Sequence, residues 1–189
     1  LAPGLLVILV SGLLGGLFAR LLTASLTGLS PDRFTAWRKR FPVRFAAAGG
    51  LAVAVIGLVS DGTTFGSGSE TVQHMLAGHA DVPTLYVMLK FMATWLTAWT
   101  GVPGGIFAPS LSIGAGIGHD IAALLGMNGA GGISPALIAM GMAGFLAAVT
   151  QAPLTSFIIV MEMVDGHAMV LSLMAVSYTH LTLPTKRIV

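Results

Sequence analysis

Gly101-Val102-Pro103-Gly104-Gly105-Ile106-Phe107-Ala108-Pro109 lies where one long apolar segment, 82–100, gives way to another, 106–125. Glycine and proline at this density disfavour an uninterrupted helix. We therefore predict that the chain breaks at 101–105 and that a new helix begins close to Ile106. The rest of the sequence has to explain why a break of this kind stands inside such apolar surroundings.

The composition indicates an integral membrane protein. Of 189 residues, 55% are hydrophobic and only 8% are charged, and there is no cysteine. Roughly a quarter of the residues in an ordinary soluble domain are charged, so this supply excludes a water-exposed surface, and the absent cysteine excludes disulfide and thiolate sites. Lys186 and Arg187 account for the whole formal charge of +2. We therefore expect no nucleic-acid partner, which would require a basic face.

Several apolar segments have about the length needed to cross a bilayer, which is about 20 residues for a helix. Arg20 is the only charged residue in the first of them. We predict an all-α polytopic membrane protein with broken and re-entrant helices. The expected apolar segments are 1–29, 45–60, 82–100, 106–125, 154–163 and a short run at 168–176. A further helix is expected between the fourth and fifth of these, with Ser134 as its N-cap and Pro135 as its first residue, running through Ala148.

Polar segments separate these helices. The basic stretch 31–44, around Trp37, has the composition of a loop at the membrane surface, and further turns or loops are expected at 61–62, 128–132, 150–153 and 165–167. Ser67 and Glu70 have the spacing of a capping box, which predicts a short helix after Ser67.

The break at 101–105 predicts an anion site. Within a bilayer a helix end is tolerated only where it is buried in protein or faces a wet cavity or a ligand. A helix N-terminus presents unpaired N–H groups and roughly half a positive charge, so it can hold an anion without a basic side chain. Gly104 and Gly105 allow a tight turn, Ala108 and Pro109 start the helix, and Ile106 and Phe107 would keep the site dry. A re-entrant turn without a ligand is the alternative.

Three blocks of sequence resemble one known family at matching intervals. They are Gly104-Gly105-Ile106-Phe107-Ala108-Pro109 with Ser110-Leu111-Ser112-Ile113-Gly114-Ala115, the upstream Lys90-Phe91-Met92-Ala93-Thr94, and the downstream Gln151-Ala152-Pro153-Leu154-Thr155 with Met161-Glu162-Met163. The family is that of the CLC chloride channels and proton/chloride exchangers. The resemblance covers residues 1–176, as a partial transmembrane domain that corresponds to helix I and most of the second half of the inverted-repeat core.

The resemblance implies chloride transport without a cofactor, in a homodimer embedded in a lipid bilayer, here a bacterial inner membrane. It implies that the backbone amides of Ile106 and Phe107 help to coordinate chloride. The family's coordinating Ser and Tyr and its gating and proton-transfer Glu residues have no counterparts in this sequence, and Tyr178 lacks the family's surrounding pattern. Channel and proton-coupled exchanger therefore both stay open.

Residues 177–189 turn abruptly polar. We interpret this tail as a junction artefact that packs poorly, and a genuine polar terminus is the alternative.

Two other classes of function compete with transport: a membrane-embedded enzyme that uses His119-Asp120, and a membrane scaffold that transports nothing. Lys90 lies inside a span, where an ionisable group is costly, and either a structural or field-shaping role or direct contact with the ion would explain it. His74, His79 and Asp81 lack the spacing of a metal site, so no metal is expected.

Overall fold

The computed structural model describes residues 2–27, 33–78, 82–83, 85–101, 104–126, 133–164 and 173–178, and these residues form helices and turns without a β-strand. The all-α prediction is therefore confirmed for the described residues. A further helical segment covers 173–178. The helices are α1 (Ala2–Thr27), α2 (Arg33–Arg40), α3 (Pro42–Val59), α4 (Ser69–Leu76), α5 (Tyr86–Thr100), α6 (Phe107–Leu124), α7 (Ile133–Thr150) and α8 (Pro153–Val164).

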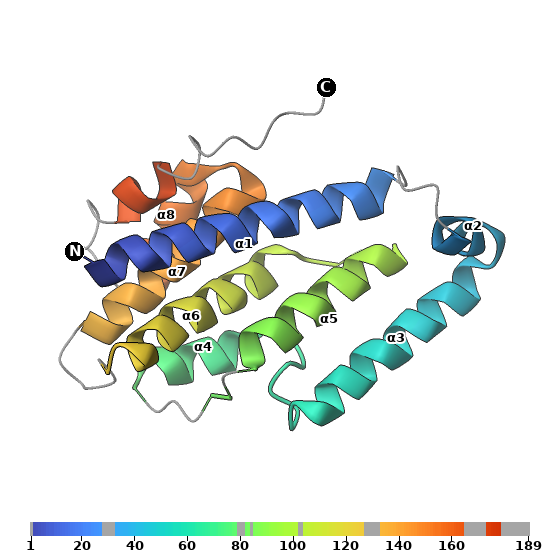
Figure 1. Cartoon of the computed structure of the whole chain (residues 1–189), viewed down its shortest axis with the longest axis horizontal. Helices are drawn as coiled ribbons and strands as arrows, with labels where there is room; N and C mark the ends of the chain where they lie inside the picture. Colours follow the sequence, from blue (N-terminus) through green and yellow to red (C-terminus); the bar gives the residue numbers. More distant parts are fainter. Residues whose placement is uncertain are drawn as a thin grey trace.

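Helices α6 and α7 form the centre of the fold, and α6 carries the predicted site. Helix α6 packs most extensively against α7 and also contacts α1, α4 and α5, while α8 packs against α7 (Figure 1). Nearly all side chains from Ser110 to Ala122 are buried. Two apolar clusters flank the helix: one joins it to α4, α7 and α8, and the other joins it to α1, α5 and α7. The helix that starts at the glycine-rich break is therefore fixed along most of its length.

Glycines set the distance between α6 and α7. A Cβ added at Gly118 would lie 2.6 Å from the Cα of Ile138, and one at Gly114 would lie 2.8 Å from the Cα of Met142. On the opposing helix, a Cβ at Gly141 would lie 3.1 Å from the backbone N of Gly118. Small residues at such positions allow helix backbones in a membrane to approach closely, so the two helices touch backbone to backbone.

The helices α1 and α3 have the length and composition of membrane spans. Pro3–Ser25 and Pro42–Val59 are both apolar over at least 18 residues. Helix α3 exposes large aliphatic side chains along its length, including Leu51 at 69% and Leu58 at 73% of their surface. An unpartnered aliphatic surface on a long helix suits contact with lipid.

The structure corrects three local expectations. The segment 31–44 is not simply a loop, because α2 occupies Arg33–Arg40 within it; the basic residues of its last turn are favourable at a helix C-terminus. The capping box is wrong, because Gly68 is the N-cap of α4 in a left-handed conformation (φ 83°) and makes no side-chain cap. The Ser67 hydroxyl instead accepts from the Ser69 amide. Helix α7 begins at Ile133, which places Ser134 inside its first turn.

Some expectations concern residues that the structure does not describe. The turns at 128–132 and 165–167 lie outside the described residues, as does the tail beyond Tyr178. At the start of the tail, Ser177 is fully buried and Tyr178 is 42% exposed. The boundary at 176 stays a prediction.

Candidate anion site at the start of α6

The chain breaks between α5 and α6, as the sequence predicts. Helix α5 ends at Thr100 and is capped by Gly101, whose φ of 78° is left-handed and therefore suits glycine. Helix α6 starts at Phe107 with Ile106 as its N-cap. The two predicted ligand residues, Ile106 and Phe107, thus lie at the start of a helix that is buried along most of its length. Val102 and Pro103 lie outside the described residues.

The first turn of α6 offers backbone donors that have no acceptor among the described residues. The amide of Ser110 donates to the carbonyl of Ile106 over 3.1 Å, which closes the first helical turn. Amides before that point have no intrahelical acceptor, and proline at position 109 has no N–H to offer. Within the described residues, no backbone acceptor pairs with the amides of Ile106, Phe107 or Ala108. These three N–H groups are the donors that an anion would use.

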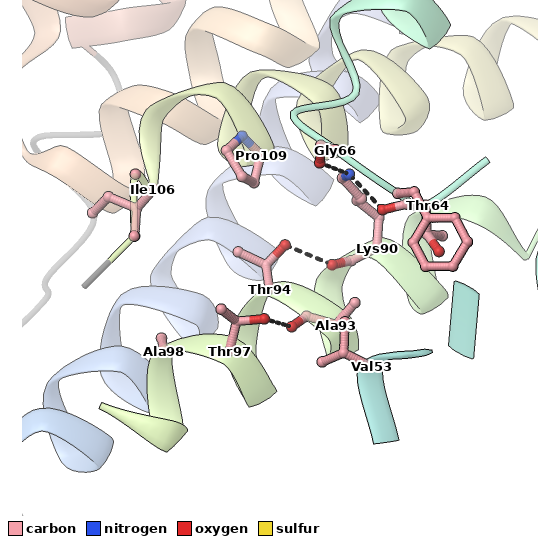
Figure 2. Close-up of a pocket in the computed structure, with 13 residues that line it drawn as sticks. Val53, Thr64, Gly66, Lys90, Ala93, Thr94, Thr97, Ala98, Ile106 and Pro109 are labelled. Carbon is pink, nitrogen blue, oxygen red and sulfur yellow. Dashed lines mark hydrogen bonds between the residues drawn. The ribbon is translucent and has the colours of Figure 1, made fainter. Parts of the chain in front are cut away.

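A cavity of about 270 Å³ adjoins this helix start (Figure 2). It lies among α3, the segment before α4, α5 and the beginning of α6, and Gly104, Gly105, Ile106 and Pro109 form its α6 side. A volume of this size holds several waters or a hydrated small ion. The remaining lining residues are Val53, Thr64, Phe65, Gly66, Lys90, Ala93, Thr94, Thr97 and Ala98.

The two predicted ligand residues differ in their side-chain environment. Ile106 lines the cavity, whereas Phe107 does not and is 49% exposed. Successive helical residues point about 100° apart, which explains why only one of them faces the cavity. Gly104, Gly105 and Ala108 are also exposed. The sequence predicts that the Phe107 ring shields the site from water. In the described part of the chain it does not, because the ring lies outside the cavity lining and is exposed.

Lys90 lies in the wall of the cavity and is tied to backbone oxygens. Its side chain is only 2% exposed, and Nζ donates to the carbonyls of Thr64 at 2.8 Å and Gly66 at 2.9 Å. Figure 2 shows the ammonium between these two carbonyls. Two of its three donors are thus committed to the segment before α4, which favours the structural role over direct contact with an ion.

Replacing Lys90 by methionine is expected to destabilise the protein by about 1–3 kcal/mol, because the substitution leaves carbonyls of Thr64 and Gly66 without a donor. The measurement is thermal unfolding in detergent of the product of the longest reading frame that encodes this chain, called the full-length product below. Lys39→Met is the control, since Lys39 is exposed on α2. Equal melting temperatures for the two variants would contradict the structural role.

The remaining sequence candidates do not converge on this site. His119 is 8% exposed, and its Nδ1 lies 3.6 Å from Oδ1 of Asp120, which is too long for a hydrogen bond. Among the described residues, Nδ1 of His119 has no hydrogen-bond partner. Glu162 is on α8, and His79, Asp81 and Asp165 lie outside the described residues. The part of the chain that the structure describes contains no cluster of potential metal ligands.

Sequence reasoning missed a buried polar contact that orients α6. The hydroxyl of Tyr86, at the start of α5, is hydrogen-bonded to Oγ of Ser112, and both side chains are buried. A Cβ at Gly68 would collide with this pair, since it would lie 2.8 Å from Cβ of Ser112. The three residues lock α4, α5 and α6 together. Ser112 lies one turn after the helix start, and no local pattern distinguishes its role from that of Ser110.

The described residues show apolar helices, a break between two of them, and a deeply buried helix whose first amides have no acceptor among these residues. These features define a class: polytopic α-helical membrane proteins with broken helices. The comparison with known families narrows the class. A family model described as voltage gated chloride channel matches residues 1–180, and the chain belongs to this family.

Curated relatives agree with the family model. The chain is 33% identical over 168 residues to the voltage-gated ClC-type chloride channel ClcB of Salmonella typhimurium, an alignment that covers 82% of this chain and 36% of that protein. It is 30% identical over 175 residues to the H(+)/Cl(-) exchange transporter ClcA of Vibrio vulnificus, covering 87% of this chain and 37% of that protein. The chain thus spans little more than a third of the length of these relatives.

Proposed function

We propose that the full-length product moves chloride or a similar small anion across a lipid bilayer, with the anion held by the backbone amides of Ile106 and Phe107. The observation that supports the proposal is the start of α6, where a family-matched stretch has backbone amides without an acceptor among the described residues and adjoins a cavity. Gly104 and Gly105, which present no side chain, allow an anion to approach, and Ala108 adds a third amide. Pro109 fixes the first turn.

Neutral donors suit transport rather than storage. An ion that permeates must bind well enough to enter and weakly enough to leave. The nearest buried cation, Lys90, is held by two carbonyl oxygens, so the backbone amides provide the principal donors on the α6 side of the cavity. The mechanism is exchange of water for peptide dipoles around the ion, with no bond made or broken, and neither an enzymatic step nor a cofactor is part of it.

The partners follow from the same proposal. The apolar spans α1 and α3 are suited to a lipid bilayer, and the bacterial relatives favour an inner membrane. A homodimer is proposed by family resemblance. The relatives carry the names of a channel and of an exchanger, so the proposal covers both.

Chloride efflux from liposomes tests the proposal. Vesicles that contain the full-length product are expected to release chloride when an ionophore allows charge balance, and empty vesicles are not. Proton uptake that accompanies efflux would identify an exchanger, and its absence a channel. The 189-residue chain by itself is expected not to conduct. Failure of the full-length product to release chloride, together with loss of a hydrolytic activity in the His119→Ala variant, would favour the enzyme.

A further inference from the structure

Basic and aromatic residues gather where α2 meets α3. We call this group the basic corner; its members are Trp37, Arg38, Lys39, Arg40, Phe41 and Arg44. Trp37 and Phe41 are each 40% exposed. In the described part of the chain no carboxylate lies within ion-pair distance of these cations, because the one pair found there is His119 with Asp120. Within the described residues, the four positive charges of the corner therefore have no carboxylate partner.

Arg38 joins the corner to the ends of two other helices. Its Nη1 donates to the carbonyl of Ser25 at 2.8 Å, near the end of α1, and to that of Trp99 at 3.1 Å, near the end of α5. The indole of Trp95 donates to the Ser25 hydroxyl at 3.1 Å. Figure 1 shows the ends of α1 and α5 pointing toward α2. These contacts fix the position of the corner relative to the membrane spans.

The guanidinium groups of Arg40 and Arg44 are held on the same ring. Their Cζ atoms lie 5.6 Å and 5.1 Å from the centroid of Phe41, within the range of a cation–π contact. Two like charges that share one aromatic ring repel each other, and an anion between or beside them would relieve this repulsion. Arginine is the side chain best suited to bind phosphate, because its N–H groups form a planar fork.

The corner lies at the depth of lipid headgroups if α1 and α3 span the bilayer, an assumption that it shares with the proposed function. Helix α3 begins at Pro42, directly after Phe41, and the apolar stretch of α1 ends at Ser25. Tryptophan is enriched at this level of membranes, and all three tryptophans of the chain, Trp37, Trp95 and Trp99, lie here. Edge-to-face contacts of Phe45 with Trp37 and with Trp99 complete the aromatic layer.

We propose that the basic corner binds the phosphate of an anionic phospholipid headgroup through Arg40 and Arg44. Charge complementarity selects this partner: four cations gather at the membrane surface, and no carboxylate of the described residues forms an ion pair with them. Basic pockets among membrane helices bind anionic headgroups in this way. Arg38 is a positioning residue, since its guanidinium is bonded to two carbonyls, and the exposed Trp37 ring would contact the glycerol and upper acyl region.

Quenching of tryptophan fluorescence by brominated lipid tests this site. Tryptophans outside this chain are first replaced by phenylalanine in the full-length product. The protein is reconstituted in mixed phosphatidylglycerol and phosphatidylcholine vesicles, with bromine on one lipid or the other. We expect brominated phosphatidylglycerol to quench more than its mole fraction predicts. Arg40→Gln and Arg44→Gln should each lower this preference about fivefold.

Arg20→Gln is the matched control, because it removes one exposed cation from α1 that is not a member of the basic corner. This variant should keep the lipid preference of the unmodified protein. Quenching in proportion to mole fraction in the unmodified protein, or an equal loss in all three variants, would overturn the proposal. Competition by millimolar inorganic phosphate would also overturn it, since that result identifies a site for the free anion. Chloride efflux measured in parallel shows whether the proposed function holds independently.

Discussion

Gly118→Ala is expected to lower the melting temperature of the full-length product, although alanine is the better helix former. The added Cβ would meet the backbone of α7, 2.6 Å from the Cα of Ile138 and 2.8 Å from the carbonyl carbon of Leu137. Backbone atoms cannot turn aside as a side-chain tip can, so the helices must separate. Overpacking of this kind costs about 1–3 kcal/mol and occasionally more, and a leucine at this position is expected to keep α6 and α7 from packing.

Gly50→Ala in α3 is the matched control. Gly50 is also helical, but a Cβ there would have no other atom within 4 Å. Helix propensity alone favours alanine over glycine by about 1 kcal/mol, so this variant should melt slightly higher. The two substitutions are chemically identical and are expected to have opposite signs in thermal unfolding. A rise in melting temperature for both would show that α6 and α7 do not approach as closely as described.

The sequence predicts the order of helices well because length and apolarity decide it. The break at 101–105 and the turn before Pro153 are both encoded by glycine or proline and are both observed. What fails is the detail of helix ends. At α4, Ser67 and Glu70 have the spacing of a capping box, yet the N-cap is Gly68. Glycine suits this position because a Cβ there would collide with Ser112. That contact comes from α6, far along the chain, and no local pattern reveals it.

The candidate site also has one part that the sequence predicts and one part that it does not. The donors at Ile106 and Phe107 could be predicted, because a helix start follows from the glycines before it and the proline after it. The cavity beside them could not, because α3 and the segment before α4 supply four of its thirteen lining residues. Lys90 shows the difference most clearly: its position in a span signals a constraint, but only the fold shows that its partners are the carbonyls of Thr64 and Gly66.

Replacing the Phe107 amide by an ester is expected to weaken halide binding to the full-length product about tenfold to a hundredfold. Incorporation of the α-hydroxy analogue of phenylalanine keeps the side chain and removes one N–H donor. A hydrogen bond to a charged group contributes about 1.5–3 kcal/mol, which corresponds to that range of affinity. Titration calorimetry with bromide measures the change, and the same substitution at Ile106 should have an effect of similar size.

The first turn of α7 supplies the control for this experiment. Both helices carry proline at their third position, Pro109 in α6 and Pro135 in α7, so Ser134 stands where Ala108 stands in α6. The amide of Ser134, like that of Ala108, lies before the first N–H group of its helix that has an intrahelical acceptor. An ester at Ser134 weakens one helix carbonyl as an acceptor, just as the ester at Phe107 does, and costs the same local stability. Only the ester at Phe107 removes an N–H donor from the start of α6, the helix end that adjoins the cavity. If both esters reduce bromide affinity equally, the loss comes from a loosened helix, and the amides of α6 do not hold the anion.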